Sequence, residues 1–125
     1  MSQEALVAEI RGLRERVPGI TDAAVAAVDG LLVAADTAAE IDPESLAALA
    51  AAGLGLARRT AAVSGRGPLR QTVTHCGGGY AVIYAVGDTA LLAVLGDEGL
   101  DLGRLHLETG ALIERLDDLL CGRTR

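Results

Sequence analysis

Hydrophobic and polar positions along this chain follow two different periods, which divide it into three predicted helices and five predicted strands. Near the N-terminus apolar residues recur at steps of three and four, which is typical of an amphipathic helix, and Pro18-Gly19 ends it. A stripe of the same period occurs near the C-terminus, where Asp101 is placed to cap a last helix. The stripe positions are Leu6, Ile10, Leu13 and Val17 in the first helix, and Leu102, Leu105, Thr109, Leu112, Ile113, Leu116, Leu119 and Leu120 in the last.

Short apolar and β-branched segments lie between these helices and are bounded by turn residues. Asp29-Gly30 predicts a two-residue hairpin turn, while Gly77-Gly78-Gly79 and Gly87-Asp88 divide a later region into a meander. The predicted strands are Ile20–Val28, Leu31–Ala35, Leu69–Cys76, Tyr80–Val86 and Ala90–Leu95. The order α-β-β-α-β-β-β-α predicts one α+β domain over residues 1–120, with a five-stranded antiparallel sheet between helices and a short tail at 121–125.

A long helix from Asp42 to about Ser64 differs from the other two because it is apolar almost all the way around. Asp42 is a suitable N-cap and Pro43 suits the first helical position. No polar side chain occurs from Leu46 to Ala57, whereas a helix that rests on one sheet needs only a single apolar stripe. We therefore expect a second cover for this helix, and in so small a domain we expect another protein chain to supply it.

Two other interpretations of this apolar run are open. A membrane span requires roughly 20 apolar residues. The twelve residues from Leu46 to Ala57 fall short of that length, so we expect no membrane insertion. Base composition is the second interpretation, because all 11 basic residues are Arg and small residues are abundant throughout. Such a bias explains why the small residues are Ala, but not why charge is missing here and common in the first and last helices.

The strand from Leu69 to Cys76 could lie at an edge of the sheet, where unpaired backbone groups favour pairing with a copy of the same strand. Alternation places Leu69, Gln71, Val73 and His75 on one face, with the intervening residues on the other. The expected homodimer interface comprises Leu46, Leu49, Ala50, Gly53, Leu54 and Ala57 across a two-fold axis, together with Arg70, Thr72, Thr74 and Cys76 of the strand.

Composition also favours association and restricts the classes of partner. Half of the 125 residues are hydrophobic, yet there is no Trp or Phe, and aromatic side chains supply much of the burial in most small domains. A net charge of −6 without a basic cluster argues against nucleic-acid binding. Cys76 and Cys121 are too few for a disulfide scaffold, and no signal or transit peptide precedes the first helix. We expect a cytoplasmic protein with both thiols reduced.

The residues that could carry catalysis do not form a recognisable site. His75 and Cys76 are neighbours on a strand and therefore point to opposite faces, and His106 has no partner in the sequence. The triple glycine from Gly77 to Gly79 precedes a strand rather than a helix, which argues against a phosphate-binding loop. We expect no enzymatic activity and no cofactor.

Two charged groups leave alternatives open. The acidic cluster Asp97, Glu98 and Asp101 could hold a hard cation, but its spacing matches no metal loop, and a solvated loop before a capped helix is the simpler interpretation. Several central arginines could reach a nucleotide bound to a partner, as an arginine finger does, although exposed arginines are common. These arginines are Arg58, Arg59 and Arg66.

Four short motifs occur in an order and spacing that a known family shares. They are Val17-Pro18-Gly19-Ile20, Val28-Asp29-Gly30-Leu31, Gly78-Gly79-Tyr80, and the run from Asp88 to Leu95 before an acidic loop and the last helix. Together they resemble the roadblock/LC7 family over nearly the full chain, and the Ala, Arg and Gly richness with Asp42-Pro43-Glu44 is similar to its actinobacterial members. The resemblance implies a profilin-like architecture and a homodimer, in which the second helices pair and the third strands join two sheets into one.

The resemblance also implies a role in signalling. Such proteins are usually encoded beside a sensor-kinase-like protein and a small Ras-like GTPase, and some stimulate GTP hydrolysis by ordering the GTPase's own catalytic groups, whereas others act as scaffolds. The leading hypothesis is a homodimeric, non-enzymatic regulator or adaptor of a small Ras-like GTPase in a bacterial signalling system. The alternatives are a passive scaffold that joins a sensor-kinase-like protein to its partners, and a small-ligand sensor, which would need a concave pocket with convergent polar groups.

Overall fold

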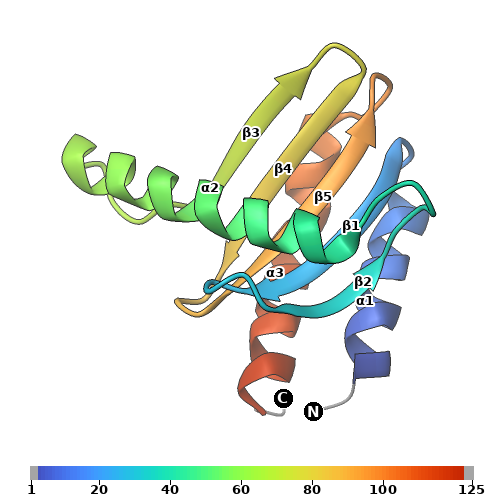
Figure 1. The fold of residues 1–125 in the computed structure, drawn as a ribbon, viewed down its shortest axis with the longest axis horizontal. Coiled ribbons are helices and arrows are strands. Elements are labelled where there is room, and N and C mark those ends of the chain that lie inside the picture. The colour runs from blue at the N-terminus through green and yellow to red at the C-terminus, as the bar shows by residue number, and fades with distance from the viewer. Residues whose placement is uncertain (1–2, 123–125) are drawn as a thin grey trace.

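A computed structural model describes residues 3–122 and has the predicted order of elements (Figure 1). The elements are α1 (Gln3–Arg16), β1 (Ile20–Ala27), β2 (Leu32–Asp36), α2 (Pro43–Ser64), β3 (Gln71–Cys76), β4 (Gly79–Val86), β5 (Ala90–Asp97) and α3 (Leu102–Cys121). The five strands form one antiparallel sheet in the order β2-β1-β5-β4-β3. The predicted α+β architecture is confirmed, and β3 lies at an edge as predicted.

The three helices divide between the two faces of the sheet (Figure 1). Both terminal helices pack on one face, where the predicted stripe of α1 is fully buried against the corresponding stripe of α3 and the large apolar residues of the central strands. The long helix α2 crosses the other face and packs through a smaller cluster of mostly Ala side chains. That cluster consists of Ala26, Ala47, Ala50, Ala51, Leu54, Leu91 and Ala93.

The ends of α2 follow the predicted signals. Asp42 has an extended backbone and accepts hydrogen bonds from the Glu44 N–H and the Ser45 hydroxyl. These bonds, the Ser45 hydroxyl first, hold the pKa of the Asp42 carboxyl below its usual value. Gly65 ends the helix in the left-handed region, at a φ of +67°.

By length and composition alone, α2 is apolar enough to cross a membrane. In the structure it packs on the sheet through Ala47, Ala50, Ala51 and Leu54, while most of its remaining apolar residues lie at the surface. The side of α2 that faces away from the sheet is therefore largely apolar and exposed in the folded domain.

Several boundaries differ by one or two residues from the predicted ones, and two regions matter most: the first hairpin, and β3 together with α3. The first hairpin has a three-residue connection rather than two, because the Ala27 N–H bonds to the Leu31 carbonyl and the Gly30 N–H bonds back to the Ala27 carbonyl. Gly30 adopts a φ of +96°, and the register shifts by one residue between Val25 and Ala26. The shift leaves Val33 as an extra residue of β2, a bulge that is separate from the three-residue connection.

The other difference concerns β3 and α3. The strand begins at Gln71, and Leu69 packs beside the α2 cluster rather than sharing a face with Gln71 as predicted. The last helix continues to Cys121, one residue beyond the end of its predicted stripe, and is capped by Gly122. Residues 123–125 of the predicted tail lie outside the described part of the chain.

Candidate interaction surface

At one edge of the sheet, β3 has more exposed residues than any other strand. A hydrogen bond of 3.0 Å from the Ala85 N–H to the Arg70 carbonyl sets the alternation of the β3–β4 ladder. Arg70, Thr72, Thr74 and Cys76 therefore bond to β4, and the residues between them direct their N–H and C=O groups away from the sheet. These outward-directed residues are Gln71, Val73 and His75. Within residues 3–122, no side chain bonds to their backbone groups.

The two faces of β3 are distinct, as the predicted alternation of Gln71 to Cys76 requires. Val73 lies opposite the buried Val82, on the face that α1 and α3 cover elsewhere, and His75 stacks on Tyr80 with ring centroids 4.5 Å apart. Thr72 lies opposite Ile83 on the α2 face. Only Thr72 among the β3 residues is partly buried, so both faces of the edge strand are largely uncovered.

The outer side of α2 adds an apolar stripe beside this edge. Leu49, Leu56 and Val63 recur every seven residues and are 73%, 65% and 91% exposed. In Figure 1 the C-terminal turns of α2 extend past β3, where no strand lies beneath them. A groove of about 390 Å³ separates this overhanging end from β3, with Ala57, Thr60 and Thr72 among its lining residues. We call Leu49, Leu56, Val63, this groove and the β3 edge the α2–β3 surface.

The structure corrects part of the predicted interface. Ala50 and Leu54 are 2% and 1% exposed and contact the chain's own sheet, so they have no surface left for a second chain. Gly53 also turns partly inward, since a Cβ atom there would lie 3.7 Å from the Ile83 side chain. Among the six predicted helix positions, Leu49 alone is fully exposed, whereas Leu46, Gly53 and Ala57 are half-buried. Leu56 and Val63 were missed, although their seven-residue spacing from Leu49 among small residues was a visible signal.

The three candidate arginines differ in whether their side chains are bonded within the chain. The Arg58 guanidinium donates to the Gly87 and Asp88 carbonyls at 3.1 and 3.3 Å, so this side chain ties α2 to the β4–β5 turn. It is therefore not the free arginine that an arginine finger requires. Arg59 and Arg66 are exposed, and no ion pair involves them within the described chain.

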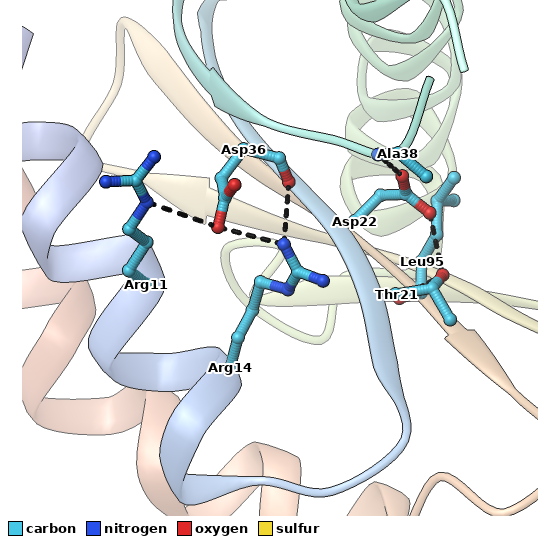
Figure 2. Close-up of polar contacts among 7 residues, drawn as sticks. All are labelled: Arg11, Arg14, Thr21, Asp22, Asp36, Ala38 and Leu95. Atoms are coloured by element: carbon cyan, nitrogen blue, oxygen red, sulfur yellow. Dashed lines mark hydrogen bonds and ion pairs between the residues drawn. The ribbon is translucent and has the colours of Figure 1, made fainter. Parts of the chain in front are cut away.

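The opposite edge of the sheet is covered by side chains of α1. The Arg14 guanidinium lies 2.9 Å from the Asp36 carboxylate and 3.5 Å from the Asp36 carbonyl, and Arg11 approaches the same carboxylate at 3.7 Å (Figure 2). The Gln3 side chain donates to the Val33 carbonyl at 2.6 Å. Two carbonyls of β2 are therefore occupied by partners from the same chain.

Asp22 secures the segment that leaves β2. Its carboxylate is almost completely buried and accepts from the Ala38 N–H and the Thr21 hydroxyl, each at 2.7 Å (Figure 2). A buried carboxylate with both oxygens bonded stabilises the connection towards α2.

The residues considered for catalysis do not come together. His75 and Cys76 lie on opposite faces of β3. The His106 Nδ1 atom lies 2.5 Å from the Tyr84 hydroxyl, so its neighbour is a phenol on β4 and not a nucleophile. Cys76 and Cys121 are free, exposed thiols.

Two carboxylates of the predicted acidic cluster accept hydrogen bonds from backbone groups close to them in the chain. Asp97 accepts from the Gly99 N–H at 2.8 Å within its turn, and Asp101 caps α3 by accepting from the Arg104 N–H at 3.1 Å. In the part of the chain that the structure describes, no group of three or more His, Cys, Asp or Glu side chains could hold a metal ion.

Comparison with known proteins places this geometry in a family. The sequence profile described as "Roadblock/LC7 domain" matches residues 6–96. An uncharacterized protein of Methanocaldococcus jannaschii is 32% identical over 101 residues, which cover 81% of this chain and 88% of that protein. The crystal structure of a Roadblock/LC7 domain from Streptomyces avermitilis has a TM-score of 0.83 at 28% identity, covering 92% of this chain and 97% of the other.

A second solved structure, Myxococcus xanthus MglB, has a TM-score of 0.87 and covers 99% of this chain and 93% of its own. Its identity is 18%, so this likeness concerns the fold.

Proposed function

Because the chain belongs to the Roadblock/LC7 domain family, we propose that it is a homodimeric regulator or adaptor of a small Ras-like GTPase in a bacterial signalling system. Domains of this family are generally non-catalytic and regulatory, which supports a role without enzymatic activity. The proposal places the protein in the cytoplasm, where such a GTPase resides.

The observation that carries the proposal is the α2–β3 surface. Two-fold pairing of β3 with its copy would satisfy the outward N–H and C=O groups of Gln71, Val73 and His75, and would extend one sheet into the next. The overhanging end of α2 would then lie over the partner's β3 and fill its groove. Burial of each large apolar side chain of the stripe contributes about 1.5–3 kcal/mol.

A dimer of this kind supplies a surface for a second protein. The two-fold axis would place two copies of the exposed Arg59 and Arg66 on the dimer. Such a surface suits a partner whose flexible loops must be held in one arrangement. The family resemblance implies that GTP hydrolysis is stimulated by ordering the GTPase's own catalytic groups. Neither arginine therefore needs to enter the active site of the GTPase.

Sedimentation velocity at micromolar concentration tests the assembly. We expect a dimer, and Leu56→Glu should raise its dissociation constant by about 100-fold, because a charge would be buried without a partner. Leu107→Glu is the matched control, since Leu107 is 77% exposed on α3, away from the α2–β3 surface. A monomeric wild-type protein, or equal effects of the two variants, would contradict the proposed interface.

Co-purification with a small Ras-like GTPase encoded beside this protein tests the partner. We expect a stable complex that Leu56→Glu weakens. GTP hydrolysis by that GTPase, measured with and without this protein, then separates a regulator from a passive scaffold, because a scaffold leaves the rate unchanged. No association with the GTPase would show that the functional proposal is wrong even if the chain is a dimer.

A further inference from the structure

A pocket of about 520 Å³ opens between the start of β3, the end of β4 and the middle of α3. It is lined by Arg70, Gln71, Tyr84, His106 and Ile113, among others, and lies mainly on the sheet face opposite α2. Gly110 forms part of its wall, and a Cβ atom at that position would meet no atom within 4 Å. The pocket is therefore open space beside α3 and does not involve the exposed stripe of α2.

The polar floor of the pocket is formed by Tyr84 and His106, which are hydrogen-bonded to each other. Tyr84 is 3% exposed, and burial raises the pKa of its phenol to about 12. The phenol is therefore protonated at neutral pH, and its oxygen lies 2.5 Å from the His106 Nδ1 atom in a hydrogen bond. This bond occupies one ring nitrogen of His106 and leaves Nε2 as the second polar group of the ring.

The charge of the lining is unusual for this chain. Acidic residues outnumber basic ones by 17 to 11, yet none lines this pocket. By contrast, the groove beside Arg11 and Arg14 contains Asp36, which neutralises them. In the described chain, the Arg70 guanidinium and the Gln71 carboxamide bond to no other side chain.

One carboxylate approaches this region from outside. Asp117 lies on the far side of Gly87, where it would contact a Cβ atom added to that residue, and it accepts a hydrogen bond from the Cys121 Sγ atom at 3.5 Å. It is not among the lining residues, so the lining itself combines a cation with neutral donors.

We propose that this pocket binds a small organic carboxylate, held by Arg70, Gln71 and His106, with a short apolar body against Leu69 and Ile113. An arginine with neighbouring neutral donors is well suited to a carboxylate, and small-ligand sites combine a few convergent polar groups with apolar walls. This inference does not rest on the proposed dimer or GTPase, although Gln71 and Leu69 also line the groove of the α2–β3 surface.

Titration of ¹⁵N-labelled protein at pH 7 in 150 mM NaCl tests the proposal, with hexanoate as the free acid and hexanamide as its neutral analogue. We expect saturable chemical-shift changes around Arg70, Gln71 and His106 with hexanoate, and at least about ten-fold weaker binding of hexanamide. N-acetyl-Leu-Leu with a free carboxyl terminus forms a second arm. Tighter binding of this peptide would identify a protein terminus as the source of the carboxylate, whereas tighter binding of hexanoate would identify a free acid.

Two pairs of variants separate the pocket from general charge effects. Arg70→Gln should weaken hexanoate binding about ten-fold, while Arg66→Gln, the same change at an exposed residue of the preceding loop, should leave it unchanged. Gly110→Leu should block the pocket, and Ala111→Leu on the exposed side of α3 should not. Equal binding of hexanoate and hexanamide, equal effects within either pair, or shifts that never saturate would overturn the proposal.

Discussion

The two edge strands of the sheet differ in what lies beside their outer backbone groups. Along β2, side chains of α1 bond to the carbonyls of Val33 and Asp36, and the ladder with β1 contains a bulge. Along β3, the outward groups of Gln71, Val73 and His75 meet no side chain of the described residues, and an overhanging apolar helix lies nearby. Two edges of similar length thus have opposite surroundings.

This difference indicates that one edge is protected and the other is available. An unpaired edge strand invites association, and proteins usually block it with charges, bulges or a covering element. The chain applies these devices at β2, where two arginines converge on Asp36 (Figure 2). No side chain of the described residues covers the backbone of β3 in this way. This difference between the two edges supports pairing through β3.

The largest expected effect comes from closing the available edge. Val73→Pro removes an N–H that points away from β4, so the internal ladder should persist while pairing with a second chain is blocked. We expect the dimer dissociation constant, measured by sedimentation velocity, to rise at least about 100-fold. Val73→Thr keeps the N–H and serves as the control; a Pro variant that dimerises normally would place the interface away from β3.

A smaller effect, on stability, is expected where the chain leaves the protected edge. Asp22→Ala would leave the Ala38 N–H without its buried acceptor, at a cost of about 2 kcal/mol in the free energy of unfolding. Urea denaturation monitored by circular dichroism measures this change. Asp22→Asn retains an acceptor oxygen and should cost less, so equal losses for the two variants would argue against the hydrogen bond as the cause.

Removing the arginine cover should affect stability more weakly. Arg14→Gln breaks the ion pair with Asp36, in which both side chains are partly buried, and we expect a loss of about 1 kcal/mol. Arg11→Gln is the matched control because Arg11 is more exposed and more distant from Asp36, so its loss should be near zero. Chemical denaturation distinguishes the two, and neither variant should alter dimer dissociation.

The smallest effect concerns the other covered carbonyl. Gln3→Ala removes an exposed hydrogen bond to Val33, and we expect about 0.5 kcal/mol or less in the free energy of unfolding. Native-state hydrogen exchange of the β2 amides provides the measurement. Faster exchange across the whole sheet, rather than near β2, would mean that Gln3 has a wider role.

Periodicity in the sequence predicted most of the fold. The stripes of α1 and α3 predicted which side chains are buried, since a single apolar face on a helix has only one way to pack on a sheet. Cap residues predicted the ends of α2, and alternation predicted the two faces of β3. The hairpin length was wrong because one glycine at positive φ admits either a two- or a three-residue connection.

The candidate surfaces were harder to predict. In α2 the apolar residues surround the helix axis, so the sequence could not show which side faces the sheet. Ala50 and Leu54 were predicted to face a second chain, but they are buried within this one. Arg58 resembled a free arginine because its acceptors, the Gly87 and Asp88 carbonyls, lie about 30 residues away. The pocket at Tyr84 and His106 gave no local signal, since these residues are separated by 22 positions.

What the sequence by itself determined is therefore the set of elements, their order and the family, because these depend on local periods, caps and turn residues that neighbouring positions share. Tertiary structure alone decided which side of α2 faces the sheet, which strand edge is covered and which distant polar groups meet. These outcomes depend on contacts between residues that are remote in the chain. The sequence of a helix that is apolar on every side does not indicate which of its residues make those contacts.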